Sequence, residues 1–379
     1  MSFRHTIRSA PARSAGLIGA AALTLAAGAT VTAQAAVYQP TVLYTMSNAD
    51  ATQGGNALLA FRAQGGDVTL FGSFATGGDG TGSALGSQGA VALADYGQQV
   101  LTVNAASDTV SDFAVGWGGK LRLLGTAPSG GTDPISVTVW GRLVEVLNAG
   151  SNSVSGLWLG DEGIHPLDRA DATASLSAGA SSPEQISFTP DGSRLVVTEK
   201  GSSTIDTFPV AGDGRLGSAV TTVATGAAPY GFGFDRSGDV VVSDAAGGPD
   251  GTAAVTTYRI EGHGTLAPIS DVPDGQGAAC WLIVNPDGNR AYTANAASGT
   301  ISSYDVAGNG DLTLRASVAA TTGGHPVDLA ISGGTLFDLV SPQGEIATAS
   351  ILPGGDLGPA SLPVMGLPAS ATGLVAVTP

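Results

Sequence analysis

The sequence predicts an all-β fold, a seven-bladed β-propeller with four antiparallel strands per blade. A repeat of about 47 residues runs along the chain with several short apolar segments in each unit, and this period is typical of propeller blades. The same hairpin turn recurs at residues 104–110, 148–154 and 295–301, with an altered copy at 199–205. No such unit can bury its apolar side alone, so the repeats are expected to pack on one another.

One stretch of the chain illustrates the expected plan of a blade. An apolar inner strand at 280–284 precedes a Pro-Asp-Gly turn at 286–288, in which Gly takes the left-handed position without steric strain. A second strand at 291–294 leads into the Asn/Ser hairpin turn and a third strand. A Gly-rich turn at 307–312 then begins the outer strand. No stretch after the N-terminal region keeps a helical apolar period, which argues against a helical fold.

The two ends of the repeat predict how the ring closes. Residues 42–46 have the character of a second strand, whereas residues 372–377 have the character of an inner strand. The first blade is therefore expected to take its inner strand from the C-terminus and its other strands from residues 42–74. Pairing of the two chain ends would remove an open sheet edge.

Composition narrows the classes of partner. Charged residues make up 12% of the chain, hydrophobic residues 43%, and the net charge is −16. An acidic chain of this kind is not expected to bind nucleic acid, which requires clustered Lys and Arg, and it would be repelled by an anionic membrane. The charge fits a soluble exported protein, which we expect to be a monomer.

The first 35 residues are interpreted as a signal peptide, followed by a single propeller domain at 36–379. Arg4, Arg8 and Arg13 give a positive start, a weakly apolar run follows, and Ala33-Gln34-Ala35 matches an A-x-A cleavage site. The mature chain would begin at Ala36 and be secreted or periplasmic, without a membrane span. An uncleaved anchor is the alternative.

No recognised metal or cofactor motif occurs in the sequence. The single cysteine, Cys280, cannot form an internal disulfide and is interpreted as a small buried side chain in an inner strand rather than a nucleophile. The mature chain carries three scattered histidines, which argues against a catalytic zinc site, and we expect no cofactor. The Asp-rich stretch 244–250 lacks the ligand spacing of a calcium loop, and calcium binding there stays open.

The repeat resembles a known family. The pattern Pro-x-x-apolar-x-Phe-x-Pro-Asp-Gly at residues 183–192, with the Asn-x-x-Ser hairpins, is similar to the seven-bladed lactonase family. That family includes propeller-type 6-phosphogluconolactonases and fungal-type carboxymuconate lactonising enzymes, and the resemblance covers about residues 42–377. It implies the seven-bladed fold and suggests activity on lactones.

The catalytic motif of the lactonising enzymes is altered in this chain. The family has Arg in a Pro-Arg-His motif and Glu in a later Asn-Glu-Leu motif, and these positions fall on Glu184 and Lys200. A family His after Pro falls on Ile135, which cannot transfer a proton. The resemblance therefore implies that the lactonising mechanism does not carry over.

Candidate site residues lie where inner strands begin and second strands end, because antiparallel neighbours place both points on one face, around the channel mouth. The catalytic candidates are Glu184, Lys200 and His325. The Glu184–Lys200 pair is interpreted either as a salt bridge without function or as a grip on a polar ligand. His325 is interpreted either as a general base or as a hydrogen-bonded loop residue. The candidate binding residues are Glu199, Tyr230, Asp244, Trp281 and Asp328.

Two function classes follow from these observations. The favoured hypothesis is an exported lactonase-like propeller with a degenerate active site, which binds a small polar ligand or a protein or glycan partner at the channel mouth. The alternative is an active lactone hydrolase, similar to 6-phosphogluconolactonase, that uses residues other than those of the family. The fold alone does not decide between them.

Overall fold

The structure is a computed structural model that describes residues 40–167, 169–177, 179, 181–246, 251–363 and 366–378. The predicted signal peptide and its cleavage site lie outside the described residues, as does part of the Asp-rich stretch 244–250. Within the described part of the chain, no helix is long and apolar enough to cross a membrane.

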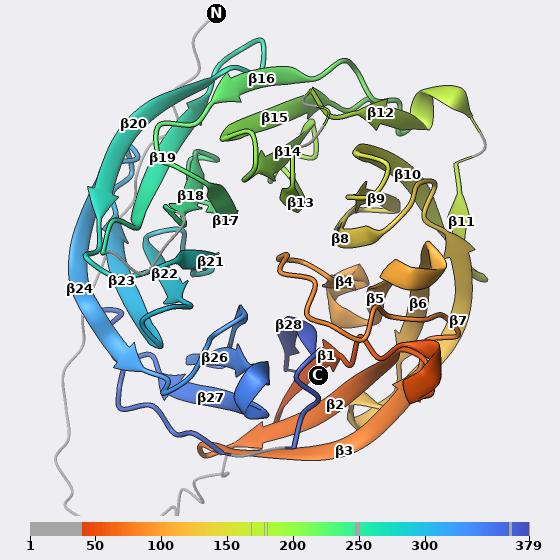
Figure 1. The fold of residues 1–379 in the computed structure, drawn as a ribbon, viewed down its shortest axis with the longest axis horizontal. Helices are drawn as coiled ribbons and strands as arrows, with labels where there is room; N and C mark the ends of the chain where they lie inside the picture. Colours follow the sequence, from red (N-terminus) through yellow and green to blue (C-terminus); the bar gives the residue numbers. More distant parts are fainter. Residues whose placement is uncertain are drawn as a thin grey trace, which may run out of the picture. The chain divides into compact units, whose positions relative to one another are not determined.

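Seven antiparallel sheets follow one another along the described chain, and each is one blade (Figure 1). The strands of blades one to three, from the inside outward, are β28 (Thr372–Val377), β1 (Thr41–Met46), β2 (Ala57–Gln64), β3 (Asp67–Ala75); β4 (Val91–Ala94), β5 (Gln99–Asn104), β6 (Thr109–Val115), β7 (Leu121–Pro128); β8 (Pro134–Trp140), β9 (Leu143–Asn148), β10 (Ser153–Gly160), β11 (Gly163–Pro166) and β12 (Thr173–Ser175).

The remaining blades have the same inside-to-outside order. Their strands are β13 (Pro183–Phe188), β14 (Arg194–Glu199), β15 (Thr204–Pro209), β16 (Val220–Val223); β17 (Pro229–Phe234), β18 (Val240–Asp244), β19 (Ala254–Ile260), β20 (Leu266–Pro273); β21 (Ala279–Val284), β22 (Arg290–Asn295), β23 (Thr300–Val306), β24 (Leu312–Thr321); β25 (Asp328–Ser332), β26 (Thr335–Val340) and β27 (Glu345–Ser350). Short 3-10 helices occupy the turns η1 (Ala51–Gln53), η2 (Asp95–Gly97), η3 (Ala105–Ser107), η4 (Trp117–Gly119), η5 (Ala170–Ala172) and η6 (Ser341–Gln343).

The blades form a closed ring, as predicted from the chain ends. Each inner strand contacts the inner strand of the next blade, in the order β28, β4, β8, β13, β17, β21, β25 and back to β28. The ring closes where β1 pairs with β28, with Val42 opposite Val377 and Tyr44 opposite Val375 (Figure 1). The seven-bladed fold and its closure through both termini are therefore confirmed.

Blades three and seven depart from the four-strand plan at their outer edges. The outer position of blade three is shared by β11 and β12, which both pair with β10. Among the described residues, blade seven has three strands, and isolated bridges at Thr348–Ser361 and Ile351–Leu357 lie where other blades have a fourth.

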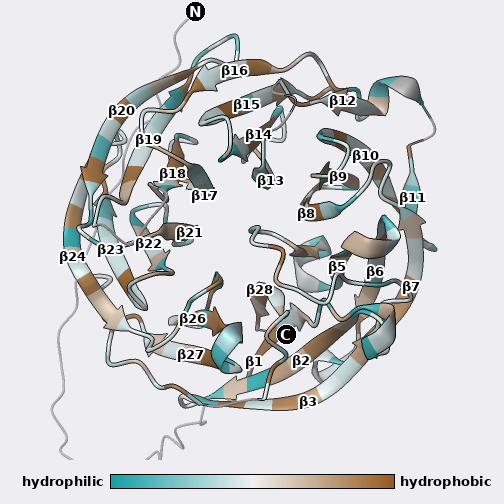
Figure 2. Cartoon of the chain, in the orientation of Figure 1, coloured by the Kyte–Doolittle hydropathy of each residue, from teal (hydrophilic) through white to brown (hydrophobic). Residues whose placement is uncertain are grey.

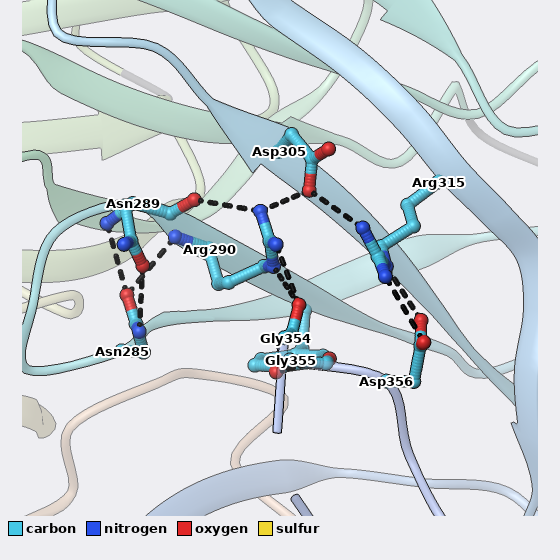
Figure 3. A network of polar contacts seen from close by, with 9 residues as sticks. Asn285, Asn289, Arg290, Asp305, Arg315, Gly354, Gly355 and Asp356 are labelled. Atoms are coloured by element: carbon cyan, nitrogen blue, oxygen red, sulfur yellow. Dashed lines mark hydrogen bonds and ion pairs between the residues drawn. The ribbon is translucent and has the colours of Figure 1, made fainter. Parts of the chain in front are cut away.

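Side chains from blade six hold the reduced edge of blade seven in place. Arg290 donates to the carbonyl of Gly354, and Arg315 forms a two-bond ion pair with Asp356, at 2.5 and 3.0 Å (Figure 3). Both arginines also contact Asp305. This network ties the turn after β27 to the neighbouring blade where strand pairing is missing.

The core lies between the blades. The third strands of five blades each place one large side chain there, fully buried: Phe61, Phe113, Phe208, Tyr258 and Tyr304. Burial of a side chain of this size contributes about 1.5–3 kcal/mol. Outer strands such as β20 and β24 alternate between hydrophobic and hydrophilic residues (Figure 2), as expected for strands with one face on a neighbour and one in solvent.

A long loop between β3 and β4 reaches into the centre of the ring (Figure 1). It spans residues 76–90, about three times the length of the corresponding loops at 129–133 and 224–228. Gln88 of this loop donates to the carbonyl of Leu282 at 2.7 Å and accepts from the N–H of Leu282 at 3.1 Å. The loop therefore links blade two to the inner strand of blade six. We call residues 76–90 the central loop.

The central loop supplies a contact that the inner strand of blade five cannot make. Gln185 on β13 binds the backbone N–H and carbonyl of Phe232 in the next blade through its side-chain amide. The equivalent residue on β17 is Gly231, which has no side chain, and a Cβ there would collide with Gln88 Oε1. Gln88 therefore binds the inner strand of blade six in the same way that Gln185 binds the inner strand of blade five.

Candidate functional site

Three backbone positions repeat at the channel mouth in blades three to six. The first precedes the inner strand in a left-handed conformation, the second is bulged out of that strand, and the third follows the second strand. In that order the residues are Asp133, Ile135 and Ala149 in blade three; Ser182, Glu184 and Lys200 in blade four; Ala228, Tyr230 and Ala245 in blade five; and Ala278, Cys280 and Ala296 in blade six.

Hydrogen bonds and bulges explain why these side chains share one face. The backbone N–H of the third residue donates to the carbonyl of the first in every blade of the set, as Lys200 does to Ser182 at 3.1 Å. A β-bulge turns its extra residue away from the normal alternation of the strand. The bulged residues, such as Glu184 and Tyr230, therefore line pockets at the mouth.

Blades three and four form a polar pocket of about 600 Å³. Its lining includes Asp133, Ser181, Ser182, Glu184 and Lys200. About half of the residues in this lining have polar side chains.

Blades five, six and seven form a second, apolar pocket of about 580 Å³. Tyr230, Cys280 and Trp281 line it together with several alanines. Two residues line both pockets, Lys200 of blade four and Ala84 of the central loop. The two pockets therefore meet at these residues.

Glu184, Lys200 and Tyr230 form a connected cluster where the pockets meet. The Lys200 Nζ atom lies 2.5 Å from Glu184 Oε1 and 4.9 Å from the centre of the Tyr230 ring. The Tyr230 hydroxyl is near enough to Glu184 to favour its charged form. Trp281 packs edge-on against Tyr230 with ring centres 5.2 Å apart. The sequence-predicted residues Glu184, Lys200, Tyr230 and Trp281 are thus brought together.

The environment of Glu184 changes its acidity. Its side chain is 6% exposed, and burial raises its pKa to about 7, although Lys200 and the Tyr230 hydroxyl favour the charged form. Burial raises the pKa of the Tyr230 hydroxyl well above its usual value, so this group stays a proton donor. A carboxyl that titrates near neutrality, beside an ammonium group and a phenol, can bind a polar group or exchange a proton with it.

His325 is separate from this cluster. It is exposed and lines the apolar pocket at its rim, and its backbone N–H donates to the side chain of Gln343 at 3.1 Å. The structure describes no ion pair or hydrogen bond between His325 and Glu184, Lys200 or Asp328.

Three other predicted binding residues are buried away from the linings of these two pockets. Asp328 accepts from the backbone N–H groups of Leu329 at 2.8 Å and Leu374 at 2.9 Å, and so joins blade seven to the closing strand. Asp244 accepts from the Thr256 hydroxyl at 2.5 Å. Glu199 is fully buried opposite Pro183. None of the three residues lines either pocket, and Asp328 and Asp244 bind groups of neighbouring strands.

Burial raises the pKa of each of these carboxyls. The pKa rises to about 7 for Asp244 and Asp328, and to about 8 for Glu199, where the neighbouring Asp206 adds to the effect. Among the described residues, no group of three or more His, Cys, Asp or Glu side chains is arranged to hold a metal ion.

Sequence reasoning missed two features of the mouth. Cys280 was expected to be buried, but the bulge aims it into the apolar pocket, where it is partly exposed. The central loop was not anticipated, although its length was a signal. Ser87 in this loop accepts a hydrogen bond from the Trp281 indole at 3.0 Å, which fixes the ring at the pocket.

Comparisons with known proteins support the family resemblance. Residues 242–330 match the family model described as lactonase, 7-bladed beta-propeller. No curated protein matches the chain in sequence.

Solved structures with the same fold include three that span nearly all of the described chain. A "putative 6-phosphogluconolactonase" from Bacteroides uniformis is 21% identical, with a TM-score of 0.69 over 88% of this chain and 99% of that one. A periplasmic gluconolactonase from Pseudomonas aeruginosa is 18% identical, with a TM-score of 0.68 over 89% and 100%. A protein from Lactobacillus plantarum is 18% identical, with a TM-score of 0.71 over 89% and 99%. The resemblance to lactonase propellers is confirmed in fold and, over one segment, in sequence.

Proposed function

We propose that this chain is an exported lactonase-like propeller that binds a small molecule at the channel mouth, with Glu184, Lys200 and Tyr230 as the polar part of the site. The observation that carries the proposal is the position of Lys200. Its ammonium group is paired with Glu184, yet its side chain is 41% exposed where the two pockets meet. A ligand in either pocket can reach it.

The pair is more than a device for stability. A half-exposed ion pair contributes little to folding, and burial of a carboxylate offsets much of the Coulomb attraction. Glu184 nevertheless occupies a bulged position in the lining of the mouth, where the nearby Tyr230 hydroxyl favours its charged form. Groups arranged in this way resemble a recognition site more than a structural contact.

Loss of the family chemistry supports a binding role. The positions of the family Arg and Glu hold Glu184 and Lys200, with both charges reversed, and the position of the family His holds Ile135. At the position of the family His, this chain therefore has no side chain that could transfer a proton in the lactonising reaction.

Hydrolysis of a lactone is the second candidate, and the pKa of Glu184 favours it. A carboxyl with a pKa of about 7 is suited to act as a general base at neutral pH. Glu184 would take a proton from water as the water oxygen bonds to the lactone carbonyl carbon, and Lys200 would stabilise the oxyanion. The bond from the carbonyl carbon to the ring oxygen then breaks, and the ring oxygen takes the proton from Glu184.

Binding and turnover can be tested with one panel of ligands: glucono-δ-lactone, 6-phosphogluconolactone and δ-decalactone. Lys200→Met should abolish the calorimetric binding signal of whichever ligand binds wild type. Lys120→Met is the matched control, because Lys120 is exposed in another blade and is the only other lysine of the chain. Unchanged binding by Lys200→Met, or no binding of any ligand to wild type, would overturn the proposal.

The hydrolase candidate has a separate readout, the release of acid from each lactone. Glu184→Gln should lower the rate about 100-fold or more, the usual effect of losing a general base. In wild type the rate should rise as the pH passes through about 7, because Glu184 must lose its proton to act. His325→Ala should keep the rate within a few-fold of the wild-type rate. A larger loss would indicate that His325, and not Glu184, is the general base.

Export is part of the proposal. The predicted signal peptide supports it, and one structure of the same fold is a periplasmic gluconolactonase. N-terminal sequencing of protein recovered outside the cytoplasm should begin at Ala36 or within a residue or two. Recovery of the full-length chain from the cytosol alone would contradict it.

A further inference from the structure

We infer that the ligand of this site is an apolar small molecule with one neutral polar end, such as an alkyl-substituted lactone, and not a sugar lactone or a phosphorylated one. The inference rests on the proposed function, since it assumes that the mouth binds a ligand through Lys200. The body of the ligand would lie in the apolar pocket of blades five, six and seven.

The lining of that pocket carries the inference. Its polar side chains are Lys200, Tyr230, Cys280, His325 and Thr372. The remaining lining residues are Gly86, Trp281, Val327, Pro342 and six alanines, which are Ala84, Ala228, Ala245, Ala278, Ala296 and Ala297. A ligand with many hydroxyl groups would lose its water here without gaining enough partners, whereas an alkyl chain gains from the same burial. The volume of about 580 Å³ suits a drug-sized molecule.

The backbone conformation of two of these alanines adds a second observation on the same lining. Ala228 and Ala278 adopt left-handed conformations, with φ of 58° and 55°, which strain a residue that has a Cβ. Glycine would fit both positions without strain, and the chain uses it at many other positive-φ positions. Both alanines line the apolar pocket, whereas the equivalent residues of the polar pocket are Asp133 and Ser182. At this left-handed position the side chain is therefore apolar in the apolar pocket and polar in the polar pocket.

Charge argues against a phosphorylated ligand. Phosphate sites usually combine arginines, lysines or several free backbone N–H groups. The lining of the apolar pocket contains one cation, Lys200, and Glu184 already neutralises it. A neutral carbonyl oxygen can accept from Lys200 without displacing Glu184, and this fits a lactone whose alkyl chain lies between Trp281 and the alanines.

The test compares two lactones with the same six-membered ring. δ-Decalactone carries an alkyl chain, and glucono-δ-lactone carries hydroxyl groups. Calorimetric titrations use the wild-type protein, which keeps the Glu184–Lys200 pair, and acid release is followed in parallel so that the heat of any hydrolysis is separated from the heat of binding. We expect δ-decalactone to bind at least 10-fold more tightly than glucono-δ-lactone. Equal or tighter binding of glucono-δ-lactone would overturn the inference, and if that binding is lost in Lys200→Met the proposed function survives. Binding of neither ligand would overturn both.

Glycine variants test the two strained alanines directly. Ala228→Gly and Ala278→Gly should each weaken δ-decalactone binding about fourfold, the effect of one buried carbon group, while the melting temperature stays the same or rises. Ala246→Gly is the matched control, because Ala246 is also left-handed, with φ of 47°, but is not in the pocket lining. Unchanged affinity in both pocket variants would show that the apolar pocket does not hold the ligand.

Discussion

Gln88 is predicted to fasten the central loop across the ring, so Gln88→Ala should destabilise the whole propeller. Its side-chain amide binds both backbone polar groups of Leu282, a residue that is fully buried and 194 positions away in sequence. Removal of the amide leaves an N–H and a carbonyl without their partners. A buried backbone group in this state is destabilised by about 1–3 kcal/mol, so the variant should lose about 2–4 kcal/mol of unfolding free energy.

The assay is urea denaturation followed by tryptophan fluorescence. Gln88→Met is the informative companion, because it fills most of the same volume but cannot form either hydrogen bond, and it should lose nearly as much stability as Gln88→Ala. Gln185→Ala breaks the equivalent pair of bonds to Phe232 and should have an effect of the same size. A loss under about 0.5 kcal/mol for Gln88→Ala and Gln88→Met, with a normal loss for Gln185→Ala, would refute the assigned role of the loop.

Three further predictions concern closure and pH. Deletion of residues 374–379 removes most of β28 and should abolish cooperative unfolding; a truncated chain that melts like wild type would refute the closure. Asp328→Ala should lose about 2–4 kcal/mol, because two buried N–H groups lose their acceptor, whereas Asp328→Asn should lose less in urea titrations at pH 5. The pKa of Asp328 is raised from 3.8 to about 7, so the folded state binds the extra proton. Its contribution to stability is complete below pH ~4 and is lost as the pH rises to about 7, by up to about 4 kcal/mol, and Asp328→Asn should flatten this part of the pH profile.

The parts of the fold that repeat could be predicted from the sequence. Each inner strand and its Pro-Asp-Gly turn are local patterns, and the strand character of residues 42–46 and 372–377 was enough to predict how the ring closes. The pairing of Glu184 with Lys200 followed from the same logic, because antiparallel neighbours bring the start of one strand to the end of the next.

The features that do not repeat could not be predicted in this way. Gln88 contacts a blade on the other side of the ring, and no local pattern encodes such a contact. The orientation of Cys280 depends on a bulge that shifts the strand alternation by one residue. His325 is exposed and lines the apolar pocket, and the sequence could not indicate that its neighbours in space would be apolar.

The most direct test of the central claim is a fluorescence titration that observes the pocket itself. Of the four tryptophans, Trp281 lines the apolar pocket, whereas Trp117, Trp140 and Trp158 do not, so their replacement by Phe leaves Trp281 as the only reporter. We predict a saturable change in Trp281 emission with δ-decalactone that disappears in Lys200→Met and persists in Lys120→Met. No emission change up to the solubility limit of the lactone would contradict an alkyl-lactone site at the channel mouth, and an emission change that is unaffected by Lys200→Met would contradict the role of Lys200 in that site.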